Sequence, residues 1–119
     1  MLRFVILTHD HPHLHWDFLV EREVGGALRS WRLEKPPDPG TPIRAEALPD
    51  HRRLYLDYEG PVSGNRGEVK RWDFGVANVL SETPEEIVIE LTGERIRGKA
   101  WLRRVVDDDW TIGYIEAND

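Results

Sequence analysis

Four of the five histidines in this chain lie within seven positions and are followed two residues later by an aspartate. The histidines are His9, His11, His13 and His15, and the aspartate is Asp17. Neutral imidazole nitrogens and carboxylate oxygens are the ligands that zinc, manganese and non-haem iron prefer in proteins, so the cluster predicts a site for one divalent metal ion. The chain has no cysteine. The ligands must therefore be nitrogen and oxygen atoms, and disulfides, thiolate zinc sites and cysteine nucleophiles are excluded.

The strand pattern around this cluster brings some of its members together. Residues 14–21 alternate between two sets of side chains, as a β-strand does, and this alternation places His15 and Asp17 on one face. Pro12 predicts a turn between this strand and the apolar run before it. The two strands then form a hairpin in which His9 faces His15 from the neighbouring strand.

Three ligands from this hairpin would form an open metal site. The imidazoles of His9 and His15 and the carboxylate of Asp17 leave positions free for substrate or water, which is typical of catalytic sites. His11 and His13 are either exposed turn residues, or one of them replaces His9 as a ligand. The structural alternative is a wet hairpin end that carries histidines without a metal.

Length and charge limit the classes of function. A chain of 119 residues predicts one domain over residues 1–119 with one core. Its net charge of −6 argues against a protein that coats nucleic acid with a continuous basic surface, but allows a site for one phosphate or one strand end. Neither a signal peptide nor a stretch near the roughly 20 apolar residues of a membrane span is found. We expect a cytoplasmic protein without membrane contact, acting as a monomer.

The rest of the chain consists of short predicted strands separated by turn residues. Strands are predicted at residues 2–8, 14–21, 27–34, 52–58, 68–74, 76–80, 86–91, 100–106 and 110–115. Residues 35–42 contain four prolines and predict a surface loop, and residues 43–48 fit either a short strand or one helical turn. The pattern predicts an all-β fold, a small closed or nearly closed β-barrel of about eight strands with a proline-rich surface loop.

Motifs along nearly the whole chain resemble, in order, the signature of the 3′-phosphoesterase domain found at the N-terminus of bacterial DNA ligase D and as stand-alone proteins. They are His9-Asp10, Leu14-His15-Trp16-Asp17-Phe18 with Glu21, Ser30-Trp31 with Lys35-Pro36, Asp50-His51 with Tyr55, Asp57-Tyr58-Glu59-Gly60-Pro61, Val69 with Trp72-Asp73 and Gly75, and Leu91-Thr92-Gly93 with Ile96-Arg97-Gly98 and Trp110.

The resemblance implies a β-barrel with a manganese-dependent activity on the 3′ ends of DNA or RNA strands. The family removes 3′-phosphate or a terminal ribonucleoside and leaves the 3′-hydroxyl that repair synthesis and ligation require. The partners implied are a nucleic-acid 3′ end, such as a primer-template, and a separate DNA ligase or polymerase.

The resemblance also implies roles for particular residues. The metal ligands, bound to Mn²⁺, would be His9, His15 and Asp17. The residues in contact with the scissile phosphate would be His51 and Tyr55. His51 is in phase with the alternation of residues 52–58, so the two side chains are predicted to point the same way. Additional positive charge would come from Lys35 and Arg44.

One of the departures from the family pattern bears directly on the phosphate contact. In the family, the Asp-Phe pair is followed by an arginine that is expected to hold the phosphate, whereas here Asp17 and Phe18 are followed by Leu19. The substitution removes a bidentate phosphate donor. The phosphate contact is therefore either lost or relocated, with Arg53 and Arg71 as the candidates.

Three hypotheses follow. The first is a metal-dependent phosphoesterase acting on nucleic-acid 3′ ends in repair. The second, favoured by Leu19, is a non-catalytic module that binds metal and a nucleic-acid end or a protein partner. The third is a cupin-like metal enzyme acting on a small molecule, suggested by His13 and His15 on a hairpin, but it leaves the motifs after residue 21 unexplained.

Overall fold

A computed structural model describes residues 1–117 of the chain. Its strands are β1 (Leu2–His9), β2 (His15–Glu21), β3 (Leu28–Leu33), β4 (Ile43–His51), β5 (Gly60–Pro61), β6 (Glu68–Thr83), β7 (Glu86–Gly93), β8 (Arg97–Val106) and β9 (Asp109–Glu116), with a 3₁₀ helix η1 (Arg53–Leu56) between β4 and β5. Among the described residues, no helix is long and apolar enough to cross a membrane.

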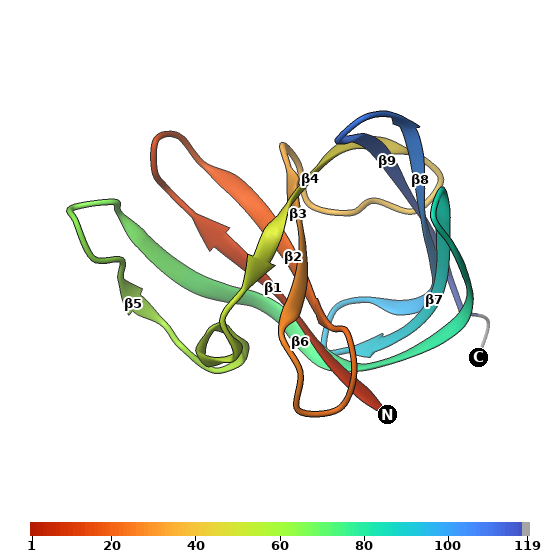
Figure 1. Ribbon diagram of the computed structural model, residues 1–119, viewed down its shortest axis with the longest axis horizontal. Helices are drawn as coiled ribbons and strands as arrows, with labels where there is room; N and C mark the ends of the chain where they lie inside the picture. Colours follow the sequence, from red (N-terminus) through yellow and green to blue (C-terminus); the bar gives the residue numbers. More distant parts are fainter. Residues whose placement is uncertain (118–119) are drawn as a thin grey trace.

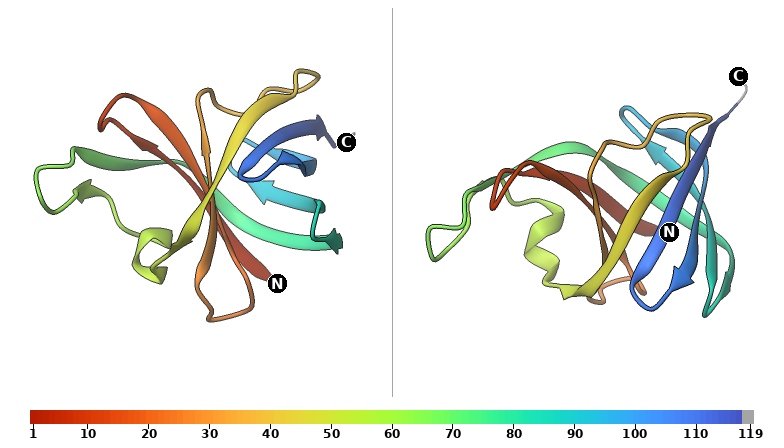
Figure 2. Two further views of the ribbon diagram at one scale, coloured as in Figure 1. Left: turned by 45° about the horizontal axis from the view of Figure 1, so that its top comes forward. Right: turned by 90° about the horizontal axis from the view of Figure 1, so that it is seen from above.

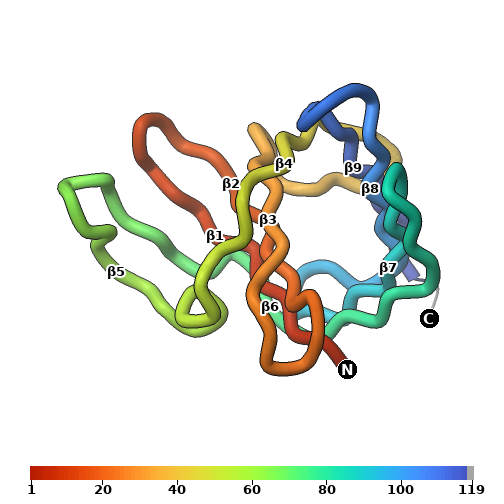
Figure 3. The backbone as a smooth tube through the Cα atoms, in the orientation of Figure 1, coloured from red at the N-terminus to blue at the C-terminus, as the bar shows by residue number. Residues whose placement is uncertain are grey.

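The strands form a closed antiparallel barrel, as the sequence predicted. The order around the ring is β1-β2-β3-β4-β9-β8-β7-β6, and the pairing of β6 with β1 closes it (Figures 1 and 3). Closure leaves no unpaired edge in the ring, and the short β5 adds to β6 outside it. The β1–β2 hairpin and the loop that leads into β6 project from the same side of the barrel (Figure 2).

Both faces of the β1–β2 hairpin are apolar, and each packs into a different layer. The barrel interior is filled from every strand of the ring, with Phe4, Ile6, Phe18 and Trp31 among its members. The outer wall carries a second layer made of Val5, Leu7, Leu19, Leu28, Leu56 and Val69. Because successive strand residues point to opposite sides, one hairpin can supply both layers. The segment that contains η1 covers the outer one.

β6 is a single strand, whereas the sequence predicted two strands that end and begin at Gly75. A Cβ atom at Gly75 would lie 2.0 Å from the carbonyl oxygen of Thr92 on β7. Glycine at this position therefore permits a close approach of the two backbones without interrupting the strand.

A β-bulge at Trp72 lets β6 contribute to both apolar layers. The register between β1 and β6 shifts between Ile6 and Leu7, and Trp72 is the additional residue on β6. Such an insertion exchanges the two faces of a strand. Val69 accordingly packs on the outer wall, whereas Ala77 faces the interior.

The structure settles one open prediction and corrects another. Residues 43–48, left open between strand and helix, belong to β4. The strand predicted over residues 52–58 is wrong, because the chain forms η1 there. Leu56 is 1% exposed and packs against the outer wall. The tertiary contact of this leucine, and not the alternating pattern, determines the local structure.

Candidate metal centre

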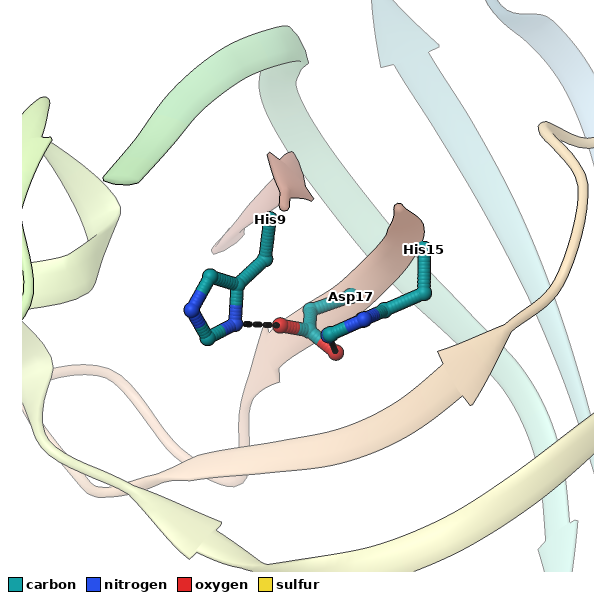
Figure 4. Close-up of side chains that lie close together, drawn as sticks. All are labelled: His9, His15 and Asp17. Carbon is teal, nitrogen blue, oxygen red and sulfur yellow. Dashed lines mark ion pairs between the residues drawn. The ribbon is translucent and has the colours of Figure 1, made fainter. Parts of the chain in front are cut away.

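The β1–β2 hairpin brings the three predicted metal ligands together on the outer wall. In the antiparallel register His9 lies opposite His15, and Leu7 lies opposite Asp17. Directly opposite residues project from the same face, so the three side chains converge near the end of the hairpin (Figure 4). One ligand atom of each residue lies within 4.8 Å of the others. The group could hold a metal ion.

Backbone carbonyl groups determine which imidazole nitrogens are available. Nδ1 of His15 lies 3.0 Å from the carbonyl oxygen of His13, and Nε2 of His9 lies 2.7 Å from that of Arg66. A carbonyl oxygen only accepts, so these nitrogens donate, and the opposite nitrogens keep their lone pairs in the neutral rings. The latter face the Asp17 carboxylate at 3.4 Å from His15 and 3.8 Å from His9. Metal-binding histidines are commonly oriented by such a second hydrogen bond.

Two buried atoms of this group have no partner among the described residues. His15 is 1% exposed and Asp17 is 4% exposed. Nε2 of His15 and Oδ1 of Asp17 lack a hydrogen bond. An unpaired buried acceptor costs about 1–3 kcal/mol, and more where it is charged. A divalent cation between the two lone pairs would satisfy both atoms, so these residues fit a metal ion.

A pocket of about 180 Å³ adjoins the ligand group. It lies between the outer wall and the covering segment, and its lining residues with polar side chains are His9, Asp17, Arg32, His51, Tyr55 and Arg66. The rings of His51 and Tyr55 are 5.9 Å apart. Their proximity arises because His51 ends β4 and Tyr55 lies in η1, not because both belong to one strand.

The two arginines proposed to replace the missing family arginine are engaged outside this pocket. Arg53 forms an ion pair with Glu21, which is 3% exposed. Arg71 lies over the ring of Phe74, with its guanidinium carbon 3.6 Å from the ring centroid. Neither side chain lines the pocket beside the metal ligands.

Lys35 and Arg44 lie together at a different surface hollow, of about 260 Å³. Arg44 also pairs with Asp109 at 3.0 Å, and this hydrogen bond raises the pKa of the arginine above its ordinary value. These two cations therefore do not line the pocket beside the metal ligands.

Arg32 and Arg66, which line the pocket, were not among the predicted site residues. Arg32 lies on β3 opposite Asp17 on β2. The alternation of β3 places Arg32 and Trp31 on opposite faces. Only the register between β2 and β3 shows that Arg32 lies opposite Asp17. Arg66 precedes β6 in a loop, for which the sequence offered no positional signal.

Comparison with known proteins identifies the family. Residues 7–104 match the DNA Ligase D 3′-phosphoesterase domain. The chain belongs to this family. It is 32% identical over 114 residues to the Multifunctional non-homologous end joining protein LigD of Pseudomonas aeruginosa, a match that covers 87% of this chain and 13% of the relative. A protein of the same name from Mycobacterium bovis is 32% identical over 116 residues, covering 90% of this chain and 15% of the relative. The chain thus spans only a small part of the length of these relatives.

Asp10, a residue of the 3′-phosphoesterase signature, joins the β1–β2 hairpin by a hydrogen bond to the loop that leads into β6. Its Oδ1 accepts a hydrogen bond of 2.8 Å from the backbone N–H of Glu68. The loop approaches closely because Gly67 has a φ of +76°, and a Cβ atom there would lie 2.2 Å from Asp10 Oδ1. Together with the contact between His9 and Arg66, this hydrogen bond holds the loop against the candidate metal centre.

The remaining two histidines flank the ligand group on the exposed turn. The ring of His11 lies 6.5 Å from that of His9, and the ring of His13 lies 6.4 Å from that of His15, measured between centroids. Both His11 and His13 are exposed. In this 3′-phosphoesterase domain they lie outside the three-residue group that could hold a metal.

Proposed function

We propose that this chain is a metal-dependent phosphoesterase that acts on the 3′ ends of nucleic-acid strands in DNA repair, removing 3′-phosphate or a terminal ribonucleoside. One observation carries the proposal. Unpartnered buried lone pairs of His15 and Asp17 adjoin a pocket shared with His51 and Tyr55. Membership of the DNA ligase D 3′-phosphoesterase family, whose relatives include proteins named for end joining, supports the substrate class.

The chemistry of the pocket residues suits phosphoester cleavage. Held by His9, His15 and Asp17, a divalent ion, which we propose to be Mn²⁺, would supply Lewis-acid stabilisation of the charge that develops on phosphate oxygens. Nδ1 of His51 lies 3.2 Å from the carbonyl oxygen of Pro49 and donates to it. In the imidazolium form Nε2 of His51 can then donate to a phosphate oxygen or protonate the leaving group.

Other groups would position the substrate. The hydroxyl of Tyr55 can donate a hydrogen bond to the phosphate, and Lys35 and Arg44 can attract the approaching strand. We propose that residues 1–119 act as one unit, as a cytoplasmic monomer working beside a separate DNA ligase or polymerase.

The test is an assay of the purified chain with Mn²⁺ and a primer-template that ends in 3′-phosphate or in a single ribonucleotide. We expect a product with a 3′-hydroxyl end and loss of that product in His51→Ala. The matched control replaces Lys99, an exposed residue on β8, with alanine. Absence of product from a chain that binds Mn²⁺ in calorimetry would overturn the enzymatic proposal.

A second function, binding of a nucleic-acid end without catalysis, is favoured by Leu19. The family arginine expected at this position is absent, and Leu19 is 0% exposed in the outer apolar layer. This alternative predicts Mn²⁺-dependent affinity for the same primer-template without product, so the same assay distinguishes the two.

A further inference from the structure

We infer that Arg32 holds the substrate phosphate in place of the family arginine that Leu19 replaces. The guanidinium enters the pocket from β3 instead of β2. The inference rests on the proposed function, because it assigns a phosphate-binding residue to the same pocket.

Arg32 and Leu19 are diagonal neighbours on one face of the sheet. The register between β2 and β3 places Arg32 opposite Asp17, and Ser30 opposite Leu19. Diagonal neighbours of this kind are separated by about 7–8 Å, a distance that an arginine side chain spans. A phosphate beside the metal ligands is therefore accessible from either position.

Arg32 has an unused donor at the pocket beside the metal ligands. Its Nε is buried and has no hydrogen-bond partner among residues 1–117. Arg53 and Arg44 are paired with carboxylates. The Nε of Arg71 also lacks a hydrogen-bond partner within that range, but this side chain lies over the ring of Phe74 and does not line the pocket. A buried donor without an acceptor costs about 1–3 kcal/mol, and a phosphate oxygen in the pocket would satisfy it.

Arg32 also stands where three hollows of the surface meet. It lines the pocket of about 180 Å³ beside the metal ligands, an open groove of about 380 Å³ shared with Arg52 and Arg66, and a hollow of about 120 Å³ shared with Arg44. One guanidinium at this junction can bind a terminal phosphate while Arg52 and Arg66 neutralise the charge of the strand beyond it.

The surroundings of Leu19 support the relocation of the phosphate-binding guanidinium from position 19 to position 32. Leu19 packs in the outer layer with Leu56, so this part of the face is apolar. The hydroxyl of Ser30, directly opposite, is buried and lacks a hydrogen-bond partner among the described residues. A polar side chain at position 19 would satisfy the hydroxyl of Ser30. In this chain position 19 is apolar, and Arg32 supplies a guanidinium on the same face of the sheet.

The decisive measurement is the affinity for a 3′-phosphorylated oligonucleotide relative to the same oligonucleotide with a 3′-hydroxyl, by fluorescence anisotropy with Ca²⁺ in place of Mn²⁺. We expect Arg32→Ala to weaken binding of the phosphorylated probe by roughly 10- to 100-fold and to leave the hydroxyl probe nearly unchanged. Arg32→Lys keeps the charge but not the planar fork and should have an intermediate effect. Lys99→Ala, which removes the same charge from β8, should bind as the wild type does.

A double variant tests the exchange between strands directly. We expect L19R/R32A to recover at least part of the affinity for the phosphorylated probe. A folded double variant, as judged by circular dichroism, that shows no recovery would contradict the exchange. Arg32→Gln retains most of the side-chain packing and replaces Arg32→Ala if the alanine variant does not fold.

The outcomes separate the inference from the proposed function. Equal affinity of wild type and Arg32→Ala for the phosphorylated probe overturns the inference, even if the wild type forms product. A selective loss of affinity in a chain that forms no product with Mn²⁺ supports the role of Arg32 and overturns the proposed hydrolysis.

Discussion

Two buried aspartates of this barrel have opposite surroundings. Asp73, which is 1% exposed, accepts hydrogen bonds of 2.7 to 3.0 Å from four backbone N–H groups, those of Phe74, Glu94, Arg95 and Ile96. Asp17, which is 4% exposed, faces imidazole lone pairs, and one of its oxygens has no partner among the described residues. Burial alone therefore does not identify a ligand. A carboxylate surrounded by donors is satisfied within the fold, whereas a carboxylate that faces lone pairs is left able to bind a cation.

The largest expected effect follows from removing the charge of Asp17. Asp17→Asn should weaken Mn²⁺ binding by more than roughly 100-fold, since loss of even an outer partner of a ligand costs about 10- to 100-fold. The metal-free protein should be at least as stable as the wild type, because an unpaired buried charge is removed. Calorimetry with Mn²⁺ and urea denaturation measure the two quantities. Wild-type Mn²⁺ affinity in this variant would remove the basis of the comparison.

Removal of the Asp73 carboxylate should have the converse result, a loss of stability without a loss of Mn²⁺ binding. Asp73→Ala leaves four N–H groups without their acceptor, one on β6 and three between β7 and β8. We expect the free energy of unfolding to fall by about 3 kcal/mol. Asp73→Asn, which keeps one acceptor oxygen, should lose less. Mn²⁺ affinity of the folded variants should stay near that of the wild type. A selective loss of Mn²⁺ binding without loss of stability would contradict the structural role.

Glu21 is a third buried carboxylate, and its contribution to stability should depend on pH. Burial raises the pKa of Glu21, but the hydrogen bonds that it accepts from Arg53, Gly25 and Arg3 outweigh burial and hold the pKa below its ordinary value of 4.5. The ionised carboxylate thus stabilises the fold fully above pH 4.5, and this stabilisation is lost as the pH falls through the lower folded value. Glu21→Gln should flatten the decline of stability below pH 4.5. Urea denaturation from pH 7 to pH 3 measures it, and an unchanged decline would contradict the assignment.

The smallest effect is expected at Asp10, a carboxylate with one N–H partner at the surface. Asp10→Ala should lower the free energy of unfolding by about 0.5–1 kcal/mol and weaken Mn²⁺ binding a few-fold, because the loop that it fastens also holds His9. Asp10→Asn keeps an acceptor oxygen and is the matched control. A loss as large as that of Asp73→Ala would mean that the loop is part of the cooperative core.

The parts of the site that the sequence could predict are those fixed within one hairpin. Turn residues and the two-residue period bring His15 and Asp17 to one face and set His9 opposite, and the hairpin has that register. Arg32 required the register between β2 and β3, which no single strand contains. The segment after His51 could not be predicted, because the alternation there favours a strand, whereas the structure has a 3₁₀ helix with Leu56 packed on the outer wall.

The bulge at Trp72 divides β6 into a part that lines the pocket and a part that packs in the barrel interior. Val69, before the bulge, lines the pocket, whereas Ala77, after it, fills the interior. Deletion of one residue here would turn the first part of β6 over and leave the second part as it is. Such a deletion would therefore alter the wall of the pocket at Val69 and leave the packing of the barrel interior at Ala77 unchanged.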